Sequence, residues 1–184
     1  MARLSEVAMV AAGDPAALEA AVAAELPFNC EHVVPQSWFG EDEPMRGDLH
    51  HLFACESRCN SFRGNTPFAE FTDFPESAPA TPEGIAAMDA VRDDCGKSAA
   101  GGFEPEQGKG PAARAAFYFR LRYPDVISAE EMPQDRWEML LTWHEQDPVT
   151  IWERHRNAAI FERQGNRNPF IDHPDWVAEA ATTR

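Results

Sequence analysis

The sequence has no long hydrophobic run. Its apolar segments all fall short of the roughly 18 residues that a membrane-spanning helix needs, and acidic residues interrupt the alanine-rich beginning at positions 6, 14, 19 and 25. No basic start leads into an apolar core, as an export signal requires. We therefore expect no membrane partner and no signal peptide in the given chain. The compartment stays open between the cytoplasm and secretion after processing.

Basic residues are also scarce. The 16 lysines and arginines face 31 acidic residues, which gives a formal net charge of −15. This balance argues against a protein that wraps nucleic acid through bulk electrostatics. Two segments, 46–63 and 154–167, are nevertheless locally rich in arginine, whose planar fork binds phosphate through two parallel hydrogen bonds. A general preference for arginine over lysine explains these segments equally well.

No internal repeat or clear domain boundary divides the 184 residues, and a hydrophobic content of 43% excludes wholesale disorder. We predict one α+β domain over residues 1–184. Turn and capping residues predict strands at 30–34 and 50–54, a loop at 36–49, and helices at 16–26, 56–63, 111–122, 128–143 and 147–163. The stretch at about 111–176 is thus mainly helical.

The chain has only four cysteines, Cys30, Cys55, Cys59 and Cys95. If the segment after residue 54 is helical, Cys55 and Cys59 lie four residues apart on one face. Cys30 and Cys95 would then complete the tetrahedral set of sulfur ligands that structural zinc prefers. We expect structural zinc, with two disulfides or unpaired buried thiols as the alternatives.

Four strings carry most of the chemical information. They are Phe28-Asn29-Cys30-Glu31-His32-Val33-Val34-Pro35, Asp48-Leu49-His50-His51-Leu52, Cys59-Asn60-Ser61-Phe62-Arg63-Gly64-Asn65 and Asn166-Arg167-Asn168-Pro169-Phe170. Cleaving a phosphodiester needs a base for the attacking water and a cation for the charge that develops on the phosphate and leaving oxygen. The imidazole of His32 suits the first task, and the oxygens of Glu31 and Asn60 suit a hard divalent cation. Adjacent side chains of a strand point to opposite faces, so the backbone must twist or leave the ladder near Glu31 and His32.

These strings resemble the endonuclease I family of nonspecific nucleases in the ββα-metal (His-Me finger) group, over roughly four fifths of the chain. The resemblance implies a ββα-metal core at about 28–65, with His32 as the general base. It implies Glu31 and Asn60 as ligands of Mg²⁺, with Mn²⁺ or Ca²⁺ as other occupants. The implied activity is hydrolysis of DNA, and often RNA, with little sequence preference, leaving 5′-phosphate and 3′-hydroxyl ends.

The phosphate-binding residues are less clearly marked. Arg63, and after it Arg46, are our candidates for the arginine that steadies the reacting phosphate. Lys109, Arg114 and Arg167 are candidates for nucleic-acid contacts, although solvated helix faces and ion pairs explain them equally well.

The other histidines and the tryptophans have ordinary interpretations. One of His50 and His51 is expected to pack and the other to orient an active-site group, whereas His144, His155 and His173 are expected at the surface or at helix ends. Trp137, Trp143, Trp152 and Trp176 are expected as core or rim aromatics, with base stacking as the alternative. Asn168 is expected to cap or brace the final loop.

A second function comes from a different class. The acidic composition fits a zinc-stabilised module that binds nucleic acid or protein without catalysis. A zinc hydrolase acting through its cysteines is a weaker alternative, because a site with four thiolates leaves no coordination position for water. The oligomeric state is not predicted.

Overall fold

A computed structural model describes residues 27–71, 91–92, 94–99 and 101–182. The helix expected at 16–26 lies outside these residues. The secondary-structure elements of this part of the chain are β1 (Phe28–His32), η1 (Gln36–Phe39), η2 (Leu49–His51), β2 (Leu52–Glu56), α3 (Ser57–Arg63), β3 (Val91–Arg92), β4 (Gly96–Ala99), β5 (Gly102–Pro105), α5 (Lys109–Arg122), α6 (Gln134–Gln146), α7 (Ile151–Gln164), α8 (Pro169–Asp172) and α9 (Trp176–Thr182). The fold class is α+β, as expected.

The first part of the fold is a strand pair followed by a helix. β1 and β2 are antiparallel, with Glu31 opposite Phe53 and His32 opposite Leu52, and α3 begins directly after β2. This is the expected order of strand, loop, strand and helix. The second strand starts two residues later than expected because the Asp48 side chain accepts from the His50 N–H and begins the 3-10 turn η2.

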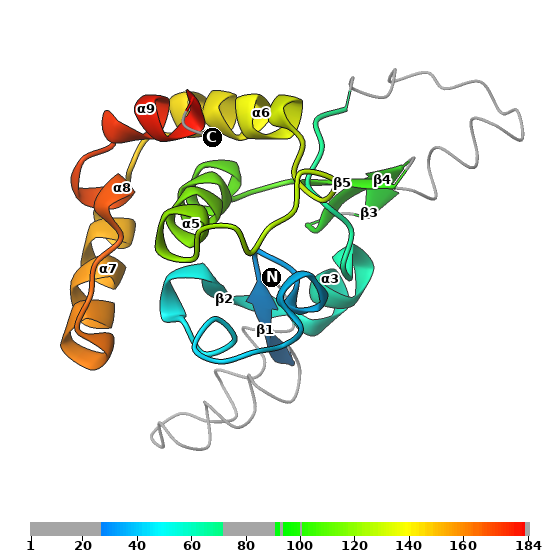
Figure 1. Cartoon of the computed structure of the whole chain (residues 1–184). Helices are drawn as coiled ribbons and strands as arrows, with labels where there is room; N and C mark the ends of the chain where they lie inside the picture. The colour runs from blue at the N-terminus through cyan, green and yellow to red at the C-terminus, as the bar shows by residue number, and fades with distance from the viewer. Residues whose placement is uncertain (1–26, 72–90, 93, 100, 183–184) are drawn as a thin grey trace, which may run out of the picture.

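Helix α5 lies at the centre of the molecule. Figure 1 shows α6 and α9 along one side of it, α7 and α8 along another, and the β1–β2 pair facing a third. Its sequence explains this position, since small and aromatic residues follow one another around the helix and residues from Gly110 to Phe119 are buried except Pro111. The core therefore surrounds α5.

The helix ends follow the capping signals with small shifts. Ser128 and Glu131 form the expected reciprocal capping bonds, but α6 begins only after Pro133. Helix α7 begins after Thr150, whose side chain forms a capping box with Glu153, and not at Pro148. None of the helices in the described ranges combines the length and the apolar character needed to cross a bilayer.

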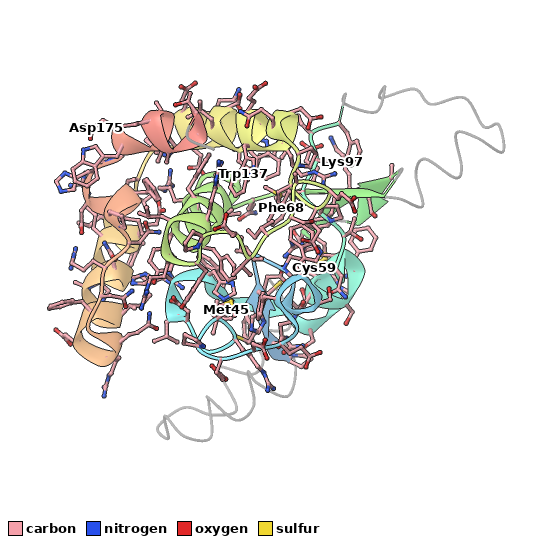
Figure 2. The ribbon with its side chains drawn as sticks, in the orientation of Figure 1. Met45, Cys59, Phe68, Lys97, Trp137 and Asp175 are labelled. Atoms are coloured by element: carbon pink, nitrogen blue, oxygen red, sulfur yellow. A yellow bond between two sulfur atoms is a disulfide. The ribbon has the colours of Figure 1, made fainter. Side chains whose placement is uncertain are left out.

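A second, three-stranded sheet was not expected from the sequence. Its order is β3-β4-β5, and all its strands are short. An isolated bridge joins Phe68 to Phe103 of β5, and both side chains enter the core, where the Phe68 ring contacts Trp143. Figure 2 shows Phe68 and Trp137 toward the interior and Lys97 and Asp175 toward the rim. This small sheet forms one wall of the cavity described below.

Candidate functional site

Helix α3 is fixed to the outer edge of β1 by two side chains. Val33 donates to the His51 carbonyl, so positions 29, 31 and 33 bond toward β2 and the carbonyls of Cys30 and His32 point away from it. Asn60 Nδ2 donates to the Cys30 carbonyl at 3.3 Å, and Arg63 Nη1 donates to the His32 carbonyl at 2.8 Å. These two residues lie nearly one helical turn apart, so α3 follows the strand at the place where Glu31 and His32 lie.

Arg63 forms a buried ion pair with Glu31. Its Nη1 bonds to Glu31 Oε1, while its other donors reach the carbonyls of Val33 and Thr66, and its guanidinium lies 4.1 Å from the centroid of the Phe68 ring. Only 3% of the Arg63 side chain is exposed, against 14% for Glu31. Arg63 therefore positions the carboxylate, and the arginine that was expected first for phosphate binding is enclosed by its own backbone partners.

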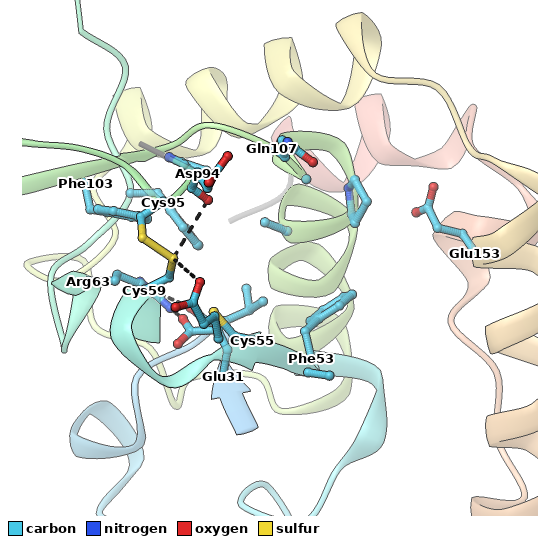
Figure 3. Close-up of a pocket in the computed structure, with 18 of the residues that line it drawn as sticks. Glu31, Phe53, Cys55, Cys59, Arg63, Asp94, Cys95, Phe103, Gln107 and Glu153 are labelled. Atoms are coloured by element: carbon cyan, nitrogen blue, oxygen red, sulfur yellow. Dashed lines mark hydrogen bonds and ion pairs between the residues drawn. A yellow bond between two sulfur atoms is a disulfide. The ribbon is translucent and has the colours of Figure 1, made fainter. Parts of the chain in front are cut away.

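Glu31 lines a cavity of about 670 Å³ between the strand pair, the small sheet, α5 and the start of α7. Figure 3 shows Glu31 and Cys55 on one side of this cavity and Glu153 across from them. Phe53 and Cys55 also line it, as expected for alternate residues of β2 that share a face.

His32 is the last residue of β1, and its imidazole contacts the loop between β1 and β2. Its Nε2 lies 3.1 Å from the Arg46 carbonyl, and its ring makes an edge contact with His51 at a centroid distance of 5.4 Å. A carbonyl only accepts, so Nε2 carries a proton, and in the neutral imidazole Nδ1 is the nitrogen with the lone pair. This tautomer leaves Nδ1 as the basic atom of the ring.

His50 and His51 are both buried. His51 Nε2 bonds to the Met45 carbonyl at 2.7 Å and His50 Nε2 to the Asn166 carbonyl at 3.1 Å, while both Nδ1 atoms have no hydrogen-bond partner within the described ranges. Burial lowers the pKa of His51 to about 4, and burial also lowers the pKa of His50. Of these two histidines, it is His51 that contacts the His32 ring. If one of them orients an active-site group and the other packs, His51 is the candidate for orientation and His50 for packing.

Asp48 fixes the loop that carries Arg46 and Met45. Its buried carboxylate accepts from Tyr118 Oη at 2.7 Å, Tyr123 Oη at 2.8 Å and Gln164 Nε2 at 2.8 Å. Burial alone would raise the pKa of Asp48, but the hydrogen bonds outweigh it and the pKa is lowered. This role was not predicted from the sequence, although an aspartate directly before a short helical turn such as Leu49–His51 is a capping signal.

The structure pairs Glu31 with Arg63 and places Asn60 on the carbonyl of the neighbouring Cys30, whereas the His32 side chain lies at Arg46 and His51. Within the described part of the chain, His32 contacts Arg46 and His51 and neither Glu31 nor Asn60, and it does not line the cavity. The backbone does not leave the ladder here, because both Glu31 and His32 stay in register with β2. No group of three or more His, Cys, Asp or Glu side chains in the described ranges is arranged to hold a metal ion.

The cysteines differ from the expected zinc site. Cys59 and Cys95 form a disulfide, so neither supplies a thiolate. Cys55 lies in β2 and Cys59 in α3, so the expected shared helical face does not exist. Cys30 is exposed, and burial together with the carboxylates of Glu31 and Glu56 raises the pKa of the Cys55 thiol. The four-cysteine zinc site is thus replaced by a disulfide and two free thiols.

Two of the basic residues expected to contact nucleic acid, Lys109 and Arg114, are paired with carboxylates inside the fold. Lys109 bonds to Glu104 at 2.6 Å and to Glu70 at 2.9 Å. Arg114 is fully buried against Glu153. These ion pairs, and not a phosphate, account for both side chains in this structure.

Arg167 is also paired with a carboxylate, whereas in the described part of the chain Arg46 is not. Arg167 forms a two-point pair with Asp172 at 2.7 and 2.6 Å. The Arg46 side chain is exposed and makes no hydrogen bond or ion pair with the residues that the structure describes. Of the expected cations, Arg46 is therefore the best placed to meet a phosphate.

The remaining expectations divide between core and surface. Trp137 and Trp143 are core residues, whereas Trp152 and Trp176 are 77% and 49% exposed. His155 and His173 are exposed, but His144 is half-buried against Arg114. Asn168 caps α8 by accepting from Phe170 N–H, as expected.

The chain matches known nucleases over most of its length. The family model for Endonuclease I matches residues 11–175. An extracellular ribonuclease of Bacillus subtilis is 34% identical over 167 residues, which cover 83% of this chain and 53% of the relative. An extracellular deoxyribonuclease of Aeromonas hydrophila is 28% identical, covering 77% of this chain and 64% of the relative. A periplasmic deoxyribonuclease of Aeromonas hydrophila is 27% identical, with 77% and 62% covered.

The chain therefore belongs to the endonuclease I family, as the resemblance of its motifs predicted. It spans between about half and two thirds of the length of these curated relatives.

Proposed function

We propose that this protein is a metal-dependent endonuclease that hydrolyses phosphodiester bonds of DNA and RNA with little sequence preference, leaving 5′-phosphate and 3′-hydroxyl ends. Family membership and the names of the relatives support the reaction class. The observation that carries the mechanism is the orientation of His32, whose Nε2 is held by the Arg46 carbonyl so that Nδ1 is basic.

His32 acts in this proposal as the general base that takes a proton from the attacking water at Nδ1. Arg46 supplies its carbonyl to the imidazole and its exposed guanidinium to the phosphate. Because Glu31 and His32 point to opposite faces of β1, the scissile phosphate must straddle the end of this strand to reach both.

Glu31 and Asn60 are the proposed ligands of a divalent cation, with β1, β2 and α3 as the ββα-metal core. The donor set fits a hard ion such as Mg²⁺, Mn²⁺ or Ca²⁺, because the Asn60 Nδ2 donates to the Cys30 carbonyl and its amide oxygen stays an acceptor, while Glu31 supplies a carboxylate. Such an ion would neutralise charge on the phosphate and the leaving oxygen. Arg63 holds the carboxylate at this place.

Plasmid cleavage tests the proposal. The full chain should nick supercoiled DNA with Mg²⁺ and not with EDTA, and His32→Ala should lower cleavage at least about 100-fold, the lower end of what a positioned base contributes. His155→Ala is the matched control, since His155 is an exposed histidine on α7. Full nicking by His32→Ala in the presence of Mg²⁺ would overturn the assignment of the base.

A non-catalytic binding module is the second candidate. The separation of His32 from Glu31 and Asn60 favours it, because neither residue contacts the imidazole in the described part of the chain. Such a module would shift DNA in a gel without shortening it, whatever the metal.

We further propose that the protein works in an oxidising compartment. Two of the relatives are named extracellular and one periplasmic. The Cys59–Cys95 disulfide supports the same setting, since disulfides persist mainly outside reducing cytosol.

A further inference from the structure

The cavity beside Glu31 differs in character from a phosphate site. Four carboxylates line it, Glu31, Glu56, Asp94 and Glu153, against the two guanidiniums of Arg63 and Arg156. Arg63 is spent on Glu31 and backbone carbonyls, and Arg156 donates to the carbonyls of Leu49 and Leu52. Both lining guanidiniums are thus engaged by protein groups, and Glu31 and Glu153 are already balanced by Arg63 and Arg114, so a phosphate would find no unpaired guanidinium among the described residues of this lining.

The rest of the lining is mostly apolar and aromatic. Phe68 and Phe103 belong to the core and line the inner end of the cavity. The guanidinium carbon of Arg156 lies over the Phe53 ring, 4.2 Å from its centroid. Trp152 lines the same cavity from the start of α7 and is 77% exposed. Its neighbour Ile151 is 73% exposed but does not line the cavity.

We propose that this cavity receives an unpaired nucleobase of a single-stranded segment, stacked on Trp152. This inference rests on the proposed function. A nucleobase is flat and uncharged, its π-face stacks on an indole, and its amino and imino N–H groups are donors for carboxylates at the rim. The volume of about 670 Å³ leaves ample room for a base.

The position of the cavity relative to β1 agrees with this occupant. A phosphate that straddles the end of β1 lies between Arg46 and Glu31, and the nucleotide next to it on the Glu31 side reaches the cavity. Bases in a duplex are paired and stacked, so they enter only after extrusion. The protein should therefore bind single strands more tightly than duplexes of equal length.

Binding can be measured without cleavage. Fluorescence anisotropy in EDTA would use the full chain with a labelled single-stranded DNA octamer, its RNA counterpart, and an octamer of the same charge whose sugars lack bases. Trp152→Ala should raise the Kd for the base-containing octamers about tenfold, which lies within the stacking contribution of one base. Ile151→Ala should leave the Kd unchanged, and Trp152→Phe should restore most of the affinity.

The octamer without bases separates this inference from electrostatic binding. Neither Trp152→Ala nor Ile151→Ala should change the Kd for this octamer, because it binds through its phosphates and has no base to stack. Equal effects of Trp152→Ala and Ile151→Ala, or an equal loss on the octamer without bases, would overturn the inference. Failure of the proposed function appears separately, as absence of plasmid nicking with Mg²⁺.

Discussion

Two buried arginine–glutamate pairs divide the molecule into a closed region and an open one. Arg114 forms two bonds to Glu153, at 2.7 and 2.8 Å, deep between α5 and α7, and also bonds to the Asp147 carbonyl. Arg63 gives Glu31 one donor and gives its other donors to backbone carbonyls. Both glutamates line the cavity, but the first pair engages both oxygens of Glu153, whereas the second engages only one oxygen of Glu31. One pair serves the architecture, and the other can serve a ligand.

Removing Arg114 should have the largest effect on stability. Arg114→Met leaves Glu153 buried without its partner, and breaking a buried pair in this way costs about 3–5 kcal/mol of the free energy of unfolding. Urea unfolding would measure the loss. Arg154→Met, an exposed position on α7, is the matched control. A loss below about 1 kcal/mol would mean that the closed pair is not structural.

Lowering the pH should weaken the region around His51 next. The folded pKa of His51, about 4, lies below its ordinary value of 6.5, so the unfolded chain takes up the proton first as pH falls. Stability is fully present above about pH 6.5 and is lost as pH falls toward 4, by roughly 3 kcal/mol from this residue. Unfolding measured from pH 7.5 to 4 should show this decline, and His51→Phe should flatten it. An equally steep decline in His51→Phe would contradict the assignment.

Changing Glu31 should affect cleavage more than stability. Glu31→Gln keeps the shape but removes the proposed ligand charge, so we expect at least about a 100-fold loss of cleavage and a weaker Mg²⁺ dependence. Arg63 keeps its backbone partners, so the free energy of unfolding should fall less than in Arg114→Met. Cleavage assays across a Mg²⁺ titration and urea unfolding measure the two effects. The contrast between the two pairs fails if the stability losses are equal.

Arg46 should give the smallest effect, confined to binding. Arg46→Ala should weaken nucleic-acid binding uniformly across sequences and reduce the slope of log Kd against log salt by about 1, the contribution of one phosphate contact. Arg167→Ala should not change the slope, since Arg167 is paired with Asp172. Equal slopes for Arg46→Ala and the unchanged protein would remove Arg46 from the interface.

Local signals in the sequence were enough for the elements that hold the site. The strand, loop, strand and helix order, the capping bonds of Ser128 and the cap at Asn168 all depend on residues within a few positions of one another. The family motifs likewise predicted membership in the endonuclease I family.

Contacts between distant residues explain what the sequence did not reveal. Arg114 meets Glu153, 39 positions away, and Asp48 meets Gln164, 116 positions away. The periodicity of hydrophobic residues does not indicate which lysines and arginines form such ion pairs within the fold. The predicted zinc site was wrong for a related reason. The boundary between β2 and α3 falls between Cys55 and Cys59, so they do not share a helical face, and Cys59 pairs with Cys95 instead.

The side chains that fix α3 to β1 also cover part of an open sheet edge. A two-stranded sheet has two free edges, and unpaired carbonyls on such edges invite strands of other molecules. Asn60 and Arg63 occupy the outward carbonyls of Cys30 and His32 on one edge, and Arg156 occupies that of Leu52 on the other. Each edge of the hairpin thus carries carbonyls that are already taken by side chains of the same molecule and are not available to a further strand.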